Sequence, residues 1–187
     1  MKNFMNFLKL GINLGLICLV AALTLSITYS FTKDRIEYQK NLEVAIAQKS
    51  IFPDAVFKEI DISTIAESNK SIINLFSAID QDSKEIGLIA IASTQGYSGS
   101  IFFVLGLNND GSIKDVRVTE QTETPGLGAN ISKDKFISQF RGKKSNDEFI
   151  VKKDIIPVTS ATISSKSITN GIKDTIKFLM ERAWEKK

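Results

Sequence analysis

The feature that most constrains this chain is an uncharged run of 23 residues near its amino end, at positions 10–32. As a helix this run reaches roughly 34 Å, against a bilayer hydrocarbon core of about 30 Å. All of its polar residues except Asn13 lie in the second half, where a helix can return hydroxyl groups to its own carbonyls. The run therefore predicts a helix that spans a membrane.

A cleaved signal peptide is the alternative interpretation of this run, because Lys2 and Lys9 precede it. The run is longer than a usual signal core and has no convincing small-x-small exit, so we favour a retained anchor. Its orientation is left open by charge, since Lys33, Arg35 and Lys40 follow it on the other side.

The 155 residues after the anchor have the length of one ordinary domain. We predict an anchor at 1–32, a juxtamembrane helix at 33–53 and a single domain at 54–187. The formal net charge is +3 and acidic and basic residues are interspersed, so nucleic acid is not an expected partner.

The chain's content of cysteine and histidine excludes several chemistries. Its one cysteine, Cys18, lies inside the apolar run, which excludes a disulfide or a cysteine-ligated metal site within the chain. Histidine is absent, which removes the commonest general base and the Ser-His-Asp and Cys-His nucleophile systems. We predict no catalytic side chain and no metal site, so any redox chemistry requires a bound organic cofactor.

Beyond the anchor, hydrophobic periodicity predicts an α+β domain with a mostly antiparallel sheet and flanking helices. Strands are expected at 55–60, 72–79, 86–92, and in a hairpin joining 101–107 to a strand through 113–118. A helix is expected over 33–50, with an apolar set at Tyr38, Leu42, Ala45 and Ile46, and a shorter one over 132–141. The last helix begins near Thr162, and its stripe is Ile168, Ile172, Ile176, Leu179 and Ala183.

Residues 159–166 put small hydroxylated side chains at the start of that last helix. Such residues usually cap a helix by accepting hydrogen bonds from its unpaired N–H groups. The same N–H groups and the helix dipole also suit a phosphate, with Lys166 as a counter-charge, and both interpretations can hold together. A Ser–Lys nucleophile pair is disfavoured, because residues one or two apart on a helix do not face each other.

Two glycine-containing loops are further candidates for a binding site. In residues 124–128, Pro125 and Gly126 predict a turn, and Gly128 would tolerate a positive φ, as in an ordinary loop. Both glycines would let the backbone approach a flat ring, while Leu127 covers it and Thr124 offers a hydroxyl. In residues 96–99 the glycines are turn residues first, and Tyr97 is either an ordinary half-buried tyrosine or an aromatic face beside a cofactor.

Three stretches together resemble a known family when they are taken in sequence order. They are Gly96-Tyr97-Ser98-Gly99, Glu123-Thr124-Pro125-Gly126-Leu127-Gly128 and Thr159-Ser160-Ala161-Thr162. Behind one amino-terminal span, they resemble the FMN-binding G subunit of the Rnf ion-translocating ferredoxin:NAD oxidoreductase. They are also similar to the C subunit of the sodium-translocating NADH:quinone reductase. The Thr-Pro-Gly-Leu-Gly element is the most specific part.

The resemblance implies an FMN attached by a phosphoester to Thr162, installed outside the cytoplasm by a flavin transferase. It implies an extracytoplasmic domain on a single-pass protein of the bacterial inner membrane. The chain departs from the family pattern at two positions: Ser160 stands where the family usually has glycine, and Ile156 stands where it usually has aspartate. The nearest acid to Ile156 is Asp154. Because the missing aspartate could weaken recognition by the transferase, FMN bound without a covalent link is an alternative. The expected cofactor-binding residues are Thr162, Ala161, Ser160, Thr159, Thr124, Pro125, Gly126, Leu127, Gly128, Lys166 and Tyr97.

The expected function is that of an electron-relay subunit in a membrane redox complex, whose enzymatic activity belongs to the complex. Its expected partners are the other membrane subunits, the flavin transferase and the membrane itself. Three alternatives are the C subunit of the quinone reductase, a membrane-anchored flavin-binding sensor or accessory domain, and a non-flavin binding module whose hydroxyl groups only cap a helix.

Overall fold

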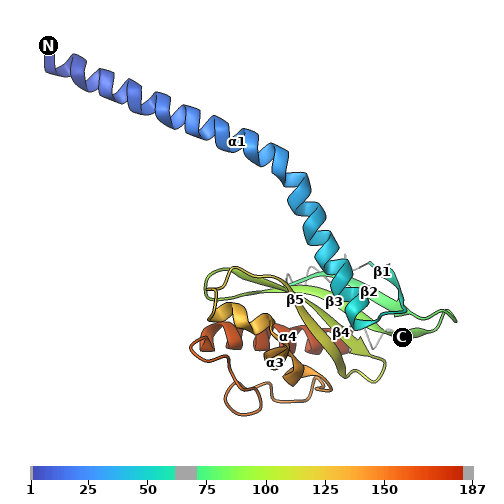
Figure 1. Cartoon of the computed structure of the whole chain (residues 1–187). Coiled ribbons are helices and arrows are strands. Elements are labelled where there is room, and N and C mark those ends of the chain that lie inside the picture. Colours follow the sequence, from blue (N-terminus) through green and yellow to red (C-terminus); the bar gives the residue numbers. More distant parts are fainter. Residues whose placement is uncertain (1, 62–70, 183–187) are drawn as a thin grey trace. The chain divides into compact units, whose positions relative to one another are not determined.

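The computed structural model of the chain describes residues 2–61 and 71–182. The chain divides into two compact units, Met1–Leu42 and Glu43–Lys187. The long helix α1 (Lys2–Ile51) forms the first unit and continues into the second (Figure 1). The predicted boundaries at 32 and 53 do not coincide with the ends of this helix. They stay predictions about where the anchor ends and where the domain begins.

The amino-terminal part of α1 has the length and composition of a membrane-crossing helix. Its hydroxyl groups are returned to the helix backbone: Thr28 donates to the carbonyl of Thr24 at 2.9 Å, and Thr32 donates to that of Thr28 at 2.9 Å. Ser30 makes the equivalent bond to Ser26 at 3.0 Å. The predicted return of hydroxyl groups is confirmed, and it lets these side chains enter an apolar environment with their donors paired.

The described strands form one antiparallel sheet in the order β1-β2-β3-β4-β5. Their bounds are β1 Val56–Ile60, β2 Ile72–Ile79, β3 Glu85–Gln95, β4 Ser100–Asn108 and β5 Ile113–Glu120. The predicted strands and hairpin are confirmed, with β3 extending three residues further than expected at its end. Each strand pairs antiparallel with the next along the chain, so the described connections between β2 and β5 are hairpins.

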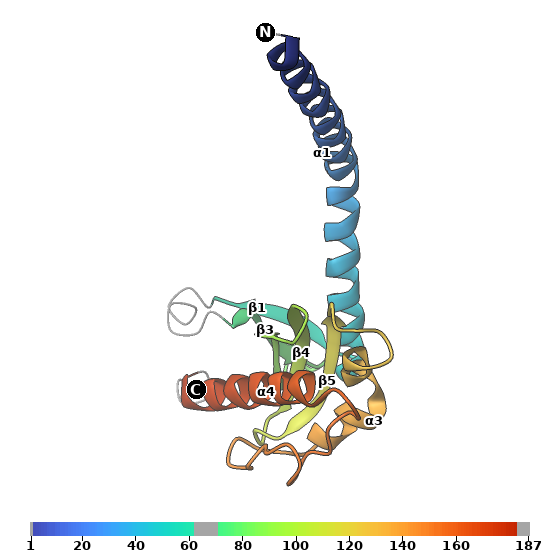
Figure 2. The same cartoon turned by 90° about the vertical axis from the view of Figure 1, so that its left-hand side faces the viewer.

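Both faces of the sheet are covered, as the nearly unbroken apolar sequence of β4 indicates. One face packs against helix α4 (Thr162–Arg182), which lies across the sheet in Figure 2, and buries Ile168, Ile172, Ile176 and Leu179. The other face buries Ala47, Ile51 and Phe52 against β2, β3 and β4. The stripe predicted for α4 is confirmed, except that Ala183 lies outside the described residues.

The α1 residues that pack on the sheet are not those of the apolar set noted in the sequence. Leu42 and Ile46 are exposed, whereas Ala47 and Ile51 are buried. The sheet receives these residues where it carries glycine: a Cβ at Gly106 would lie 2.4 Å from Ile51 Cγ2. The buried face of α1 is therefore determined by its fit against the sheet and not by the period of apolar residues along the helix.

The segment between β5 and α4 begins with three short helical turns in place of the single helix predicted over 132–141. They are η1 (Gly128–Ser132), α3 (Asp134–Ile137) and η2 (Ser138–Phe140). Lys133 interrupts them because its backbone is extended, with φ −75° and ψ 145°. The predicted apolar side Phe136, Ile137 and Phe140 is nevertheless buried in the main core.

Candidate functional site

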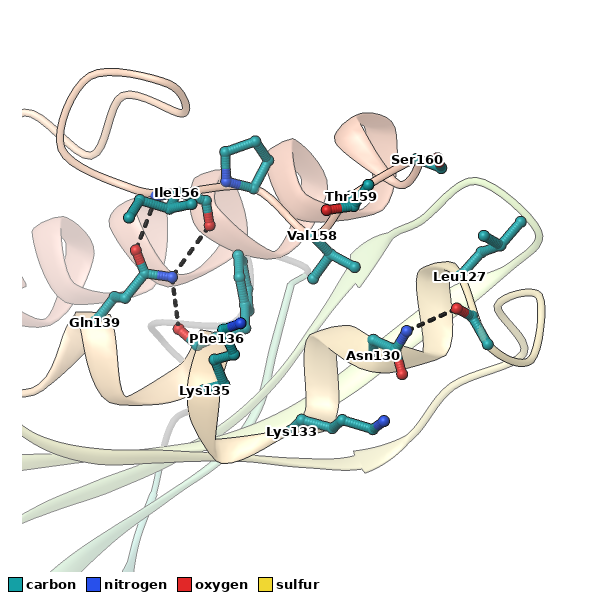
Figure 3. A pocket seen from close by; sticks show the side chains of 12 residues that line it. Leu127, Asn130, Lys133, Lys135, Phe136, Gln139, Ile156, Val158, Thr159 and Ser160 are labelled. Carbon is teal, nitrogen blue, oxygen red and sulfur yellow. Dashed lines mark hydrogen bonds between the residues drawn. The ribbon is translucent and has the colours of Figure 1, made fainter.

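A pocket of about 590 Å³ lies between the turn after β5, the three short helical turns and the strand-like segment before α4 (Figure 3). Its volume is in the range of small-molecule sites. The lining residues are Gly126, Leu127, Asn130, Lys133, Lys135, Phe136, Gln139, Ile156, Pro157, Val158, Thr159 and Ser160. They combine apolar walls with two lysines, and none of them is acidic.

Gln139 fixes one wall of the pocket. Its side-chain oxygen accepts a hydrogen bond from the N–H of Ile156 at 2.8 Å, and its amide nitrogen donates to the carbonyl of Ile156 at 3.1 Å. The same nitrogen donates to the carbonyl of Phe136 at 3.2 Å (Figure 3). One side chain thus holds the segment before α4 against α3, as a neighbouring strand would.

The turn at the other side of the pocket has the geometry of a type II β-turn. The N–H of Leu127 donates to the carbonyl of Thr124 at 3.1 Å, and Gly126 has φ +77°. Asn130 Nδ2 donates to the carbonyl of Gly126 at 2.7 Å. A Cβ at Gly126 would meet no atom within 4 Å, so its backbone faces open space beside the pocket.

Gly128 has a different role from the one its sequence suggested. Its φ is not positive, and in this turn the positive φ that glycine permits is found at Gly126 instead. Gly128 is buried, and a Cβ there would lie 2.6 Å from Glu123 Oε2 and 2.8 Å from Ser164 Oγ. Glycine is required at this position by the protein's own packing.

Glu123 connects the three stretches that the sequence singled out separately. Its side chain is buried, and Oε1 accepts hydrogen bonds from the N–H groups of Tyr97 at 2.7 Å and Ser98 at 3.1 Å. Oε2 accepts from Ser164 Oγ, on the first turn of α4, at 2.6 Å. Sequence reasoning quoted this residue within a motif without giving it a role.

The first turn of α4 keeps its N–H groups free of side-chain caps. The carbonyl of Ala161 accepts the first hydrogen bond of the helix, from the N–H of Ser165 at 3.0 Å, so Ala161 is the N-cap residue. An alanine has no side-chain hydroxyl that could cap the first N–H groups. Ser165 Oγ is engaged with the carbonyl of Ala161 and the N–H of Val158. Among the hydrogen bonds of residues 71–182, none caps the N–H groups of residues 162–164, which leaves this positive helix end able to accept an anion.

Ser160 precedes this turn in a left-handed backbone conformation, with φ +62°. It is exposed and lines the pocket. Glycine adopts such a φ without steric cost, whereas other L-residues are disfavoured there by about 1–2 kcal/mol. The conformation explains why a glycine suits this position in the family that the sequence resembles.

Asp154 does not take the place of the acid that the resemblance expects at Ile156. It accepts hydrogen bonds from Lys143 Nζ at 2.8 Å and from the N–H groups of Phe149 at 3.1 Å and Ile150 at 2.5 Å. Burial raises the pKa of Asp154, but these hydrogen bonds outweigh it and the pKa is lowered. Ile156 itself is 76% exposed and lines the pocket, so an apolar side chain stands where an acid was expected.

The structure gathers the predicted site residues unevenly. Gly126, Leu127, Thr159 and Ser160 line the pocket, and Ala161 and the half-buried Thr162 follow directly at the start of α4. Exposed residues outside the lining are Thr124, Pro125, Lys166 and Tyr97. The lining residues that sequence reasoning did not propose are Asn130, Lys133, Lys135, Phe136, Gln139, Ile156, Pro157 and Val158.

The missed residues had one usable signal in the sequence. Asn130, Lys133 and Gln139 form the polar side of a segment that directly follows the Pro-Gly turn. We interpreted that segment only through its buried apolar side. The polar residues next to the Pro-Gly turn were therefore the sequence feature that could have identified this side of the pocket.

Comparison with known proteins places two family models on the chain. A model described as an FMN-binding domain matches residues 96–177, which include all three motifs, and one described as the RnfG N-terminal region matches residues 1–48. The fold is similar to the crystal structure of Shewanella oneidensis NqrC, with a TM-score of 0.50 and 17% identity over 65% of this chain and 73% of that chain.

Two relatives are similar in sequence. The chain is 38% identical over 104 residues to the G subunit of the proton-translocating ferredoxin:NAD(+) oxidoreductase complex of Clostridium ljungdahlii, covering 53% of this chain and 56% of that protein. The match thus spans about half the length of that relative. The chain is also 29% identical over 185 residues to the G subunit of the Na(+)-translocating ferredoxin:NAD(+) oxidoreductase complex of Acetobacterium woodii, covering 90% of this chain and 89% of that protein.

Proposed function

We propose that the chain is a G subunit of the Rnf type, that is, a membrane-anchored electron-relay flavoprotein of an ion-translocating oxidoreductase. We further propose that it holds FMN through a phosphoester to Thr162. The observation that carries the proposal is the pocket beside the uncapped start of α4, within the region matched as an FMN-binding domain.

The residues present fit a flavin mononucleotide. The free N–H groups of residues 162–164 suit a phosphate at the helix start. The apolar lining formed by Leu127, Phe136 and Val158 suits an aromatic ring, and the exposed backbone at Gly126 allows close approach. Lys133 and Lys135 add positive charge to the same lining, which favours an anionic ligand.

When bound, FMN supplies the redox chemistry, which matches a chain without histidine and with one membrane-embedded cysteine. The chain's own residues bind and orient the cofactor. Leu127 and Val158 exclude water from the pocket wall, while Gln139 keeps the segment before α4 in place through Ile156. This division of labour requires no side chain to act as acid, base or nucleophile on a substrate.

The covalent link requires an activated donor, because an ester does not form from a free phosphate without loss of water. Thr162 would hold the FMN phosphate through its hydroxyl oxygen. The activated donor would be a flavin phosphoanhydride, whose other phosphate-bearing half would leave as the hydroxyl proton is lost, and a flavin transferase would catalyse this transfer. Attachment outside the cytoplasm would place the domain on the extracytoplasmic side of the bacterial inner membrane, next to the other membrane subunits of the complex.

The test is Thr162→Ala in the full-length chain co-expressed with a flavin transferase. We expect the wild type to be yellow and fluorescent on a denaturing gel, with the added mass on the peptide that contains Thr162. The variant should lose this covalent flavin and still fold, because Thr162 makes no capping bond among the described residues. Ser160→Ala is the matched control, since it removes an exposed hydroxyl two residues away.

Two outcomes would contradict the proposal. A wild-type chain that never carries flavin would remove the function, and covalent flavin retained by Thr162→Ala would remove the attachment site. Co-purification in mild detergent separates the relay from a flavin-binding sensor, because only a relay subunit is expected to remain with other membrane-spanning redox subunits.

A further inference from the structure

Three segments far apart in the sequence meet at one buried carboxylate. Glu123 lies 26 residues after Tyr97 and 41 residues before Ser164, and it receives hydrogen bonds from both. Its side chain is 4% exposed, and each of its oxygens is occupied. The three donors are neutral, and among the ion pairs of the described residues none involves Glu123.

Two glycines show how closely the surrounding backbone is built around this side chain. A Cβ at Gly96 would lie 2.2 Å from Glu123 Oε1, and one at Gly128 would lie 2.6 Å from Oε2. Both distances are far below van der Waals contact, so each oxygen has a glycine packed against it. The carboxylate therefore has one position available, set by the loop of 96–99 on one side and by η1 and α4 on the other.

Glu123 immediately precedes the Thr124–Leu127 turn, and its partner Ser164 is two residues after Thr162. A displacement of this carboxylate would therefore move the pocket-lining turn relative to the proposed attachment hydroxyl. We propose that Glu123 is the positioning residue of the flavin site, which holds the pocket turn, the 96–99 loop and the first turn of α4 in register. This inference rests on the proposed function, because it concerns the geometry in which the flavin is held.

Two substitutions test the length of the Glu123 side chain and its charge separately. Glu123→Gln keeps the length, and its carbonyl oxygen can accept from the N–H groups of Tyr97 and Ser98 while its amide donates to Ser164 Oγ. Glu123→Asp keeps the charge but is shorter by one methylene, about 1.5 Å, which takes hydrogen bonds of ordinary length out of range. A positioning role predicts that Gln substitutes for Glu and Asp does not.

The experiment uses the full-length chain co-expressed with a flavin transferase, and it measures the rate of covalent flavin attachment and the visible spectrum of the bound flavin. We expect Glu123→Gln to attach flavin at close to the wild-type rate. Glu123→Asp should attach it up to about 100-fold more slowly, as when a reacting group is displaced by about 1 Å. Amide hydrogen exchange of the peptide containing residues 96–99, measured without flavin, should accelerate in the Asp variant only.

Thr175→Ala is the control for a merely structural effect. Thr175 is buried on α4, and its hydroxyl donates to the carbonyl of Gly171 at 2.7 Å, away from the pocket. If it slows attachment as much as Glu123→Asp, lost stability explains the result and the inference fails. The inference is also overturned if Glu123→Asp attaches flavin like the wild type, or if Glu123→Gln is as slow as Glu123→Asp. A wild type without flavin would instead overturn the proposed function, and this inference with it.

Discussion

Replacing Ser160 by glycine should stabilise the protein, although it removes a side chain. Ser160 has φ +62°, its side chain is exposed, and no hydrogen bond of that hydroxyl is found among residues 71–182. A left-handed conformation disfavours a non-glycine residue by about 1–2 kcal/mol. Glycine loses about 0.5–1 kcal/mol more conformational entropy on folding. The difference predicts a net stabilisation of about 0.5–1 kcal/mol.

Urea unfolding of the full-length chain in detergent measures this effect. With a slope of about 2 kcal/mol per M, a gain of about 0.75 kcal/mol raises the urea midpoint by about 0.4 M. Ser98→Gly is the matched control, because Ser98 is exposed in a loop but does not have a positive φ. The same chemical change there should lower stability, since only the entropic cost of glycine remains. Equal midpoint shifts for the two variants would refute the reasoning from φ.

Two further outcomes follow from packing and charge. Gly128→Ala should lower the free energy of unfolding by about 1–3 kcal/mol in urea, because the added Cβ would lie 2.6 Å from Glu123 Oε2. Unchanged stability would show that η1 can move away from Glu123 and would contradict this reasoning. Asp154 should stabilise the domain fully above its unfolded pKa of about 3.9, and this contribution should disappear as the pH falls through its lowered folded pKa. Asp154→Asn should therefore be less stable than the wild type at neutral pH, with the difference shrinking below about pH 4; a difference independent of pH would exclude the charge as its cause.

Local patterns in the sequence were sufficient for most of the fold. The continuous apolar run of β4, the turn residues between β4 and β5, and the 3.6-residue period of α4 are all local features of the sequence. The uncharged run at 10–32 likewise indicated a membrane helix by length alone. The short turns around Lys133 escaped this approach, because a single extended residue interrupts a helix without disturbing its apolar period.

The candidate site was readable only as separate motifs. The Pro-Gly turn, the hydroxylated start of α4 and the 96–99 loop were each recognisable, and the resemblance joined them. Their physical roles were less accessible: a glycine's sequence neighbours do not reveal whether it needs a positive φ, as Gly126 does, or an absent Cβ, as Gly128 does.

Only the tertiary structure decided how these motifs meet. Glu123 reaches Tyr97 and Ser164 across 26 and 41 residues, and Gln139 reaches Ile156 across 17. Such contacts depend on where the sheet places its loops in space. A periodic pattern in the sequence carries no information about which distant loops lie close together. The sequence by itself determined the membrane anchor, the strands and the residue types of the site, because those follow from local spacing and solvent preference. The pocket and the hydrogen bonds of the buried Glu123 carboxylate exist only once the folded chain brings distant segments together.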